Sequence, residues 1–140
     1  MFKTAKLITE LFEERGMKYT VDEMPDVNII TLECEGDDHV DQAYHFICNE
    51  ERNDVTVHSD VIANVPEEKE EEMLELLCRL NSELQFAKIW MDGDNDLMLA
   101  MDISREVSDE YLGKVAFEAF YRMIKAFEKV YSRVMKCLWS

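Results

Sequence analysis

The chain has few basic residues, few glycines and no long apolar run. Only 15 Lys and Arg stand against 31 Asp and Glu in 140 residues, so the formal net charge at pH 7 is −16. A chain this acidic repels phosphate backbones and anionic lipid surfaces, so we expect it to bind neither nucleic acid nor membranes. None of the four glycines belongs to a phosphate-binding loop motif. No apolar run approaches the roughly 20 residues that span a bilayer, so we expect no membrane-spanning segment.

The N-terminal segment does not have the pattern of a signal peptide. Residues 1–6 lead into an amphipathic stretch that carries acids at Glu10, Glu13 and Glu14. A signal peptide would instead continue into an apolar region with a small-residue cleavage site. We therefore expect the protein to be cytoplasmic.

The cysteines are scattered rather than grouped. Cys34, Cys48, Cys78 and Cys137 show no C-x-x-C spacing, and three of them lie in apolar stretches. A disulfide framework or a zinc site would normally bring cysteines closer together in the sequence. We interpret them as buried free thiols in a reducing compartment.

The length and the hydrophobic pattern predict a single domain, residues 1–140, of the α+β class. The expected order is α-β-β-β-α-β-β-α, and a further short strand at residues 18–21 is compatible with the pattern. The expected elements are a helix at 2–15, strands at 28–34, 41–48 and 55–61, a helix at 66–80, strands at 86–91 and 96–103, and a long helix from 108 onward. Short hairpin connections indicate an antiparallel sheet of five or more strands, accompanied by three helices.

Three segments in the second half of the chain resemble the YbjN family. They are residues 65–69 (Val-Pro-Glu-Glu-Lys), residues 76–81 (Leu-Leu-Cys-Arg-Leu-Asn), and residues 86–88 (Phe-Ala-Lys) with the acidic turn that follows them. The resemblance implies the type III secretion chaperone-like fold. It also implies a small, acidic, often dimeric protein that binds other proteins, acts as a regulator and has no known catalytic residues. We therefore expect a homodimer and a protein partner whose identity the sequence does not give.

The charge is unevenly distributed along the chain. Residues 1–110 hold 29 acids and 9 bases, whereas residues 111–140 hold 2 acids and 6 bases. Helix electrostatics explain part of this pattern, because acids favour helix starts and bases favour helix ends. The alternative, which we favour less, is that the basic C-terminal segment lies on an acidic surface of its own chain or of a partner.

Two motifs could bind metal ions. Residues 92–96 (Asp-Gly-Asp-Asn-Asp) begin like a calcium loop, but the required glycine and glutamate are replaced by Leu97 and Ile103. Strand patterns on both sides favour a hairpin turn here instead. If residues 49–54 form a turn, Cys48 faces Val55 and His45 lies directly across from His58. Two imidazoles make a weak transition-metal site without a nearby acid, so we favour an exposed or dimer-facing histidine pair and expect no metal or cofactor.

The C-terminal helix carries the clearest signal for interaction. Seven of the fourteen aromatic residues lie in residues 111–140. One apolar stripe suffices to pack a helix on a sheet, and Phe117 and Tyr121 widen that stripe toward a second face. Core packing of a broad helix explains this pattern. The functional alternative is an aromatic patch that receives a partner, formed by Phe117, Tyr121, Tyr131 and Trp139.

Three functions are compatible with these features. We predict a non-enzymatic protein-interaction module, chaperone-like or regulatory, because no nucleophile has an identifiable base and no pair of acids can be nominated for acid–base catalysis. The alternative is a protein that binds a small ligand or a divalent cation through its acidic surface or its histidine pair. An enzyme of unrecognised type is the third hypothesis.

Overall fold

The computed structural model describes residues 1–35 and 41–140, and this part confirms the predicted α+β class. Its elements are α1 (Lys3–Glu14), β1 (Thr20–Glu23), β2 (Val27–Glu35), β3 (Asp41–Asn49), β4 (Asp54–Ile62), the short 3-10 helix η1 (Glu67–Lys69), α2 (Glu70–Glu83), β5 (Lys88–Met91), β6 (Leu97–Ile103) and α3 (Asp109–Trp139). The short extra strand exists as β1, two residues later than the sequence pattern placed it. The turn at residues 36–38, and with it His39, lies outside the described residues. Among those described, no helix combines the length and apolar character needed to cross a membrane.

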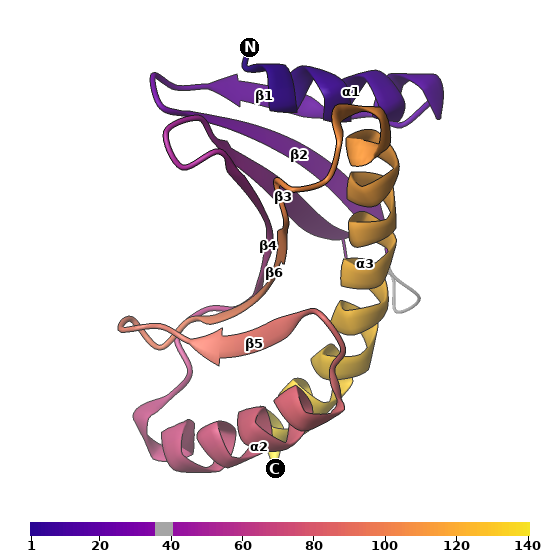
Figure 1. The fold of residues 1–140 in the computed structure, drawn as a ribbon. Coiled ribbons are helices and arrows are strands. Elements are labelled where there is room, and N and C mark those ends of the chain that lie inside the picture. Colours follow the sequence, from indigo (N-terminus) through magenta and orange to yellow (C-terminus); the bar gives the residue numbers. More distant parts are fainter. Residues whose placement is uncertain (36–40) are drawn as a thin grey trace.

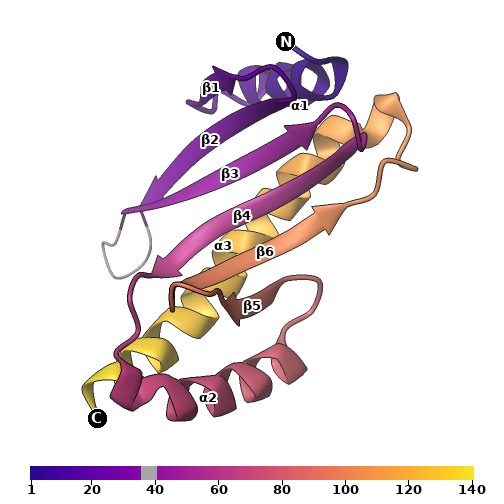
Figure 2. The ribbon, with the colours of Figure 1, turned by 90° about the vertical axis from the view of Figure 1, so that its left-hand side faces the viewer.

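The six described strands form one antiparallel sheet in the order β1-β2-β3-β4-β6-β5. The predicted register between β3 and β4 is confirmed, since Cys48 pairs with Val55 and His45 pairs with His58. The helix α2 separates β4 from β5 in sequence, as expected, and β6 pairs with β4 while β5 takes the edge. The sheet is curved and all three helices lie on its convex side, with α3 running behind the strands (Figure 1 and Figure 2).

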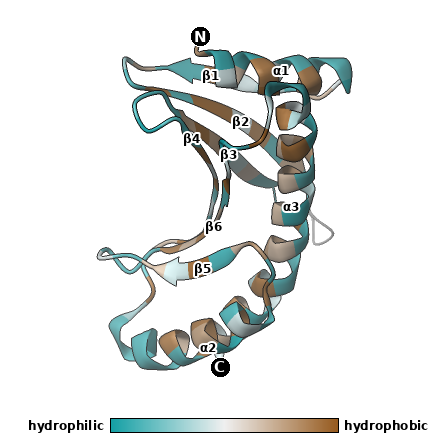
Figure 3. Cartoon of the chain, in the orientation of Figure 1, coloured by the Kyte–Doolittle hydropathy of each residue, from teal (hydrophilic) through white to brown (hydrophobic). Residues whose placement is uncertain are grey.

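Strict alternation along the central strands builds the core between the sheet and α3. On β3 the side chains of Tyr44, Phe46 and Cys48 are all at most 1% exposed. The Tyr44 ring meets the Phe120 ring of α3 edge-on, with centroids 5.4 Å apart. Aromatic pairs in this geometry contribute beyond the area that they bury. Apolar colour accordingly follows the central strands and much of α3, whereas the start of α2 is hydrophilic (Figure 3).

The first helix is tied to α3 by a close approach at Gly113. A Cβ atom at this position would lie 2.9 Å from the Leu11 Cβ and 3.2 Å from the Leu7 carbonyl oxygen. Neither of these atoms is the far end of a flexible side chain, so only glycine lets the two helices approach this closely. The helix α1 then ends as predicted at Gly16, which has φ +68°. The amides of Gly16 and Met17 donate to the Glu13 and Phe12 carbonyls, which together form a Schellman motif.

We expect Gly113→Ala to destabilise the protein, although alanine is the better helix former. The helix-propensity gain of about 1 kcal/mol is outweighed by overpacking against α1, which typically costs about 1–3 kcal/mol. Chemical denaturation should therefore show a free energy of unfolding lower by about 1 kcal/mol. Gly93→Ala is the matched control, because nothing lies within 4 Å of the position that its new methyl group would take. A Gly113→Ala protein as stable as the control would show that the helices separate without cost.

Candidate functional site

One face of the sheet is left uncovered by the described helices, and we call it the open face. It is the concave side, which is turned toward the viewer in Figure 2. Its central side chains are half-buried among their neighbours, apart from the more exposed Trp90: Ile29, Thr31, Ala43, His45, Ile47, Thr56, His58, Trp90, Met98 and Ala100. A mixed apolar and aromatic surface of this kind, without a covering layer, is typical of a binding face.

The histidines lie at the centre of the open face, in one cross-strand row. Thr31 pairs with His45, His45 with His58, and His58 with Ala100. The Thr31 hydroxyl lies 2.9 Å from His45 Nδ1. The ring centroids of His45 and His58 are 6.3 Å apart, and the indole of Trp90 lies 6.4 Å beyond His58. The sequence therefore located the histidine pair correctly, but it gave no sign of the adjoining tryptophan.

Burial lowers the pKa of His58 below its ordinary value. The neighbouring His45 lowers it further, while the Asp60 carboxylate opposes the shift from 3.8 Å away. His58 is therefore neutral at pH 7. The carboxylate of Asp60 approaches His58, but the ligand atoms of His45, His58 and Asp60 do not converge on one point. Within the described residues, the one group of three such ligand atoms that lie within 4.8 Å of one another is Asp92, Asp94 and Asp96.

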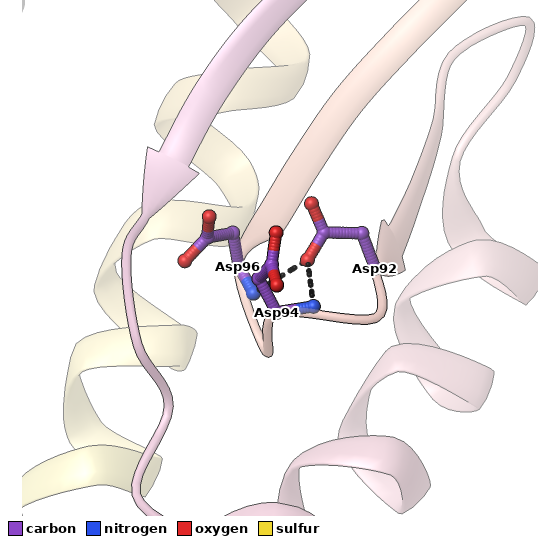
Figure 4. A group of neighbouring side chains, drawn as sticks. All are labelled: Asp92, Asp94 and Asp96. Carbon is purple, nitrogen blue, oxygen red and sulfur yellow. Dashed lines mark hydrogen bonds between the residues drawn. The ribbon is translucent and has the colours of Figure 1, made fainter.

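These three aspartates build a turn, as the sequence analysis favoured. One Asp92 carboxylate oxygen accepts hydrogen bonds from the Asp94 and Asp96 amides, at 2.9 and 3.0 Å (Figure 4). The Asp96 carboxylate accepts from the Asn64 amide at 2.8 Å, and the Asn95 carbonyl accepts from the Val65 amide. The carboxylates of Asp92 and Asp96 therefore close the β5–β6 hairpin and anchor the segment that leads into α2.

The open face is bordered by carboxylates, which we call the acidic rim: Asp22, Glu33, Asp60 and Asp102. All four residues are exposed, and each pairs in register with an open-face residue on a neighbouring strand. Asp102 also accepts a hydrogen bond of 2.9 Å from the Thr56 hydroxyl. The rim gives the open face a mostly negative border around a largely uncharged centre. Lys88 on the edge strand β5, which pairs with Ala100, is a base on this border.

The four aromatic residues nominated on α3 do not form one patch. Phe117 is half-buried beneath the Arg15 guanidinium, 4.9 Å from its ring centroid. Tyr131 stacks on the core residue Phe127 at 5.1 Å. Tyr121 and Trp139 are exposed, by 55% and 81%. Phe117 and Trp139 are separated by about 33 Å along the helix, so one small partner surface would not contact all four.

Phe86 is an interaction candidate that the sequence analysis missed. It is 62% exposed and has φ +70°, the left-handed region that bulky residues avoid. The Ala87 amide donates to the Gln85 carbonyl at 2.8 Å, so Phe86 is the centre of the rare, strained γ-turn. Such a conformation costs about 1–3 kcal/mol. Sequence patterns around the end of α2 contain no signal for it.

The described cysteines are free, as predicted. The prediction that they are buried holds fully for one of them, partly for two, and is wrong for the fourth. Cys78 is exposed, Cys34 and Cys137 are half-buried, and Cys48 is buried. Cys78 points outward because the core side of α2 is formed by Met73, Leu76, Leu77 and Leu80. Burial raises the pKa of Cys48 to about 12, so this thiol stays protonated and unreactive.

A curved antiparallel sheet with all its described helices on one side defines the structural class, and comparisons with known proteins assign the family. The family model named YbjN, described as "Putative bacterial sensory transduction regulator", matches residues 4–129. The chain therefore belongs to the YbjN family. No curated protein matches it in sequence.

A solved structure shares this fold. The crystal structure of E. coli YbjN, described as "a putative transcription regulator", aligns with a TM-score of 0.61 at 12% identity, covering 92% of each chain. A second similar structure is the heterodimeric ExoU–SpcU complex from the type III secretion system of Pseudomonas aeruginosa. Its TM-score is 0.48 at 13% identity, covering 93% of this chain and 96% of that one.

We expect His58 to make stability fall as the solution is acidified. The folded state holds the pKa of His58 below its ordinary value of 6.5. The stability it contributes is thus present above that value and is lost as pH falls through the lowered pKa. Denaturation at about pH 7.5 and pH 5 should show a larger loss for the wild type than for His58→Gln. Equal losses would contradict the assignment. The carboxylates whose pKa is lowered, Glu23, Glu83 and Asp109, titrate below this window.

We expect Phe86→Gly to leave the free energy of unfolding within about 1 kcal/mol of wild type, because relief of strain offsets glycine's greater chain entropy. Phe86→Ala is the matched control, since alanine also loses the ring but keeps the left-handed strain. Calorimetric melts should rank the glycine variant above the alanine variant. The reverse ranking would show that the turn at Phe86 is not strained.

Proposed function

We propose that this protein is a non-enzymatic protein-interaction module, chaperone-like or regulatory, whose open face receives a partner. The observation that carries the proposal is the open face itself. Ten positions of mostly apolar or aromatic character share the concave face of the sheet, which no helix among the described elements covers. The family's description as sensory transduction regulators supports a regulatory role.

The shape and charge of the open face favour one kind of occupant, an amphipathic helix with basic flanks. A helix about 10 Å across suits a concave sheet surface. Ile29 and Ile47, which pair directly on neighbouring strands, offer an apolar floor. Trp90, 41% exposed, offers a large aromatic anchor of the kind enriched at binding hot spots. Lys or Arg side chains on the flanks of the helix would meet the acidic rim.

A partner captured from the source cell should depend on Ile47. Ile47→Asp places an unpaired charge on the apolar floor of the open face and should abolish capture, because desolvating that charge is costly. Leu74→Asp is the matched control: Leu74 is a 46% exposed apolar residue on α2, away from the open face. Circular dichroism should confirm that both variants fold.

The same experiment separates the open face from the α3 residues. If Ile47→Asp still captures the partner while Tyr121→Ala or Trp139→Ala loses it, the interaction surface lies on α3 and the open-face proposal is wrong. Phe117 and Tyr131 are less suited to this test, because both pack against neighbouring side chains.

We also propose that the protein is a cytoplasmic homodimer, which is supported by its family resemblance and by the edge positions of β1 and β5 in the sheet. Light scattering should then give twice the chain mass of 16.5 kDa. A monomer mass at high micromolar concentration would contradict this assembly.

A second candidate function is binding of a divalent transition metal. The observation that favours it is the direct pairing of His45 with His58, with ring centroids 6.3 Å apart. Calorimetry with Ni²⁺ tests it: binding should be lost in His45→Gln, and heats that are the same in the variant and the wild type would exclude this pair as the ligands.

A further inference from the structure

A groove lies between the end of α2 and the middle of α3, on the helical side of the molecule. Its volume is about 550 Å³, within the roughly 300–1,000 Å³ of ligand pockets. We call it the basic groove, after the Arg122, Lys125 and Lys129 side chains that line it, with Leu84, Tyr121 and Ala126 among the remaining lining residues. It shares no residue with the open face.

The charges in the basic groove are not balanced within it. Glu118 is paired with Arg122, at 2.8 and 3.1 Å. Glu83 is paired with Arg133, which lowers the Glu83 pKa. The Lys129 ammonium donates to the Glu83 carbonyl oxygen at 3.4 Å, and its charge helps to lower the Glu83 pKa without a direct ion pair. Lys125 approaches an acid only at 4.0 Å, at Glu128 outside the groove lining. Three basic and two acidic side chains therefore line the groove, which makes its lining locally positive in a protein of net charge −16.

Aromatic rings accompany the basic side chains. The Arg122 guanidinium lies over the Phe86 ring at 4.3 Å, and the Lys125 ammonium lies 5.4 Å from the Tyr121 ring centroid. Both rings are more than half exposed. Phe86 is not part of the groove lining, but its contact with Arg122 places an apolar wall at the border of the groove. Positive charge beside an apolar wall suits a ligand that carries both carboxylates and an apolar side chain.

We propose that the basic groove is a second binding site, specific for a short acidic peptide segment of a partner protein that carries an apolar side chain. Carboxylates of the peptide pair with Lys125 and Lys129, and its apolar side chain packs over Leu84 and against Phe86. A polypeptide is favoured over nucleic acid, because the acidic remainder of the protein repels a long polyanion while a short segment can contact the groove alone.

Fluorescence anisotropy tests the proposal with a defined probe, a labelled peptide that carries a single leucine between glutamates. Lys125→Glu should weaken binding by about tenfold or more, since it replaces an attraction with a repulsion. Lys114→Glu is the matched control: it makes the same charge change on an exposed position of the same helix, outside the groove lining. Phe86→Gly should also weaken binding, because it removes the apolar wall. Glycine adopts the φ of +70° at this position readily, so the backbone of the turn is kept.

Several outcomes would overturn the proposal. These are the absence of peptide binding to the wild type, equal weakening by Lys125→Glu and Lys114→Glu, and unchanged affinity for a peptide with glutamine in place of glutamate. Tighter binding of a single-stranded DNA oligonucleotide than of the peptide would also overturn it, since the ligand would then be a nucleic acid. Selective weakening by Lys125→Glu and Phe86→Gly supports it.

Discussion

The rest of the structure depends on the packing of α3 along the convex side of the sheet. This helix has 31 residues and therefore extends about 46 Å, long enough to contact the core side of the central strands and both other helices. Gly113 fixes α1 against its first half, and α2 packs beside its second half. Because this arrangement places every described helix on one face, the strands supply the core from alternate residues only. The remaining residues form the open face.

The two proposed binding surfaces differ in charge because acids and bases are unevenly distributed along the chain. Acids are spread over the strand ends and over α2, whereas three of the six bases of residues 111–140, Arg122, Lys125 and Lys129, line the groove between α3 and the end of α2. At an ionic strength of 0.1 M the Debye length is about 10 Å, so a ligand in the basic groove experiences mainly the nearby lysines. At longer range the net charge of −16 dominates, and it steers basic partners toward the protein.

The sequence predicted best what depends on periodicity. The turn after β3 set the pairing of His45 with His58, and the same alternation placed Tyr44 and Phe46 in the core. It predicted less well what depends on helix crossings: whether Phe117 is free is decided by Arg15 of α1, far away in sequence. The open face could have been found, because Ile29 and Ile47 are apolar residues at positions where a solvated face would be polar. Phe86 could not have been found, because its φ follows from how the end of α2 meets β5.

Phe86 shows why a residue that is poor for folding can be informative. The contact of its ring with Arg122 contributes about 0.5–1 kcal/mol at an exposed site. This does not exceed the cost of its backbone strain, which is about 1–3 kcal/mol. The ring also remains 62% exposed. Glycine would adopt the same turn with far less strain. Neither core packing nor turn geometry therefore explains a phenylalanine here. The binding role proposed for its ring does, because the ring contacts Arg122, and Arg122 lines the basic groove together with Tyr121, Lys125 and Lys129.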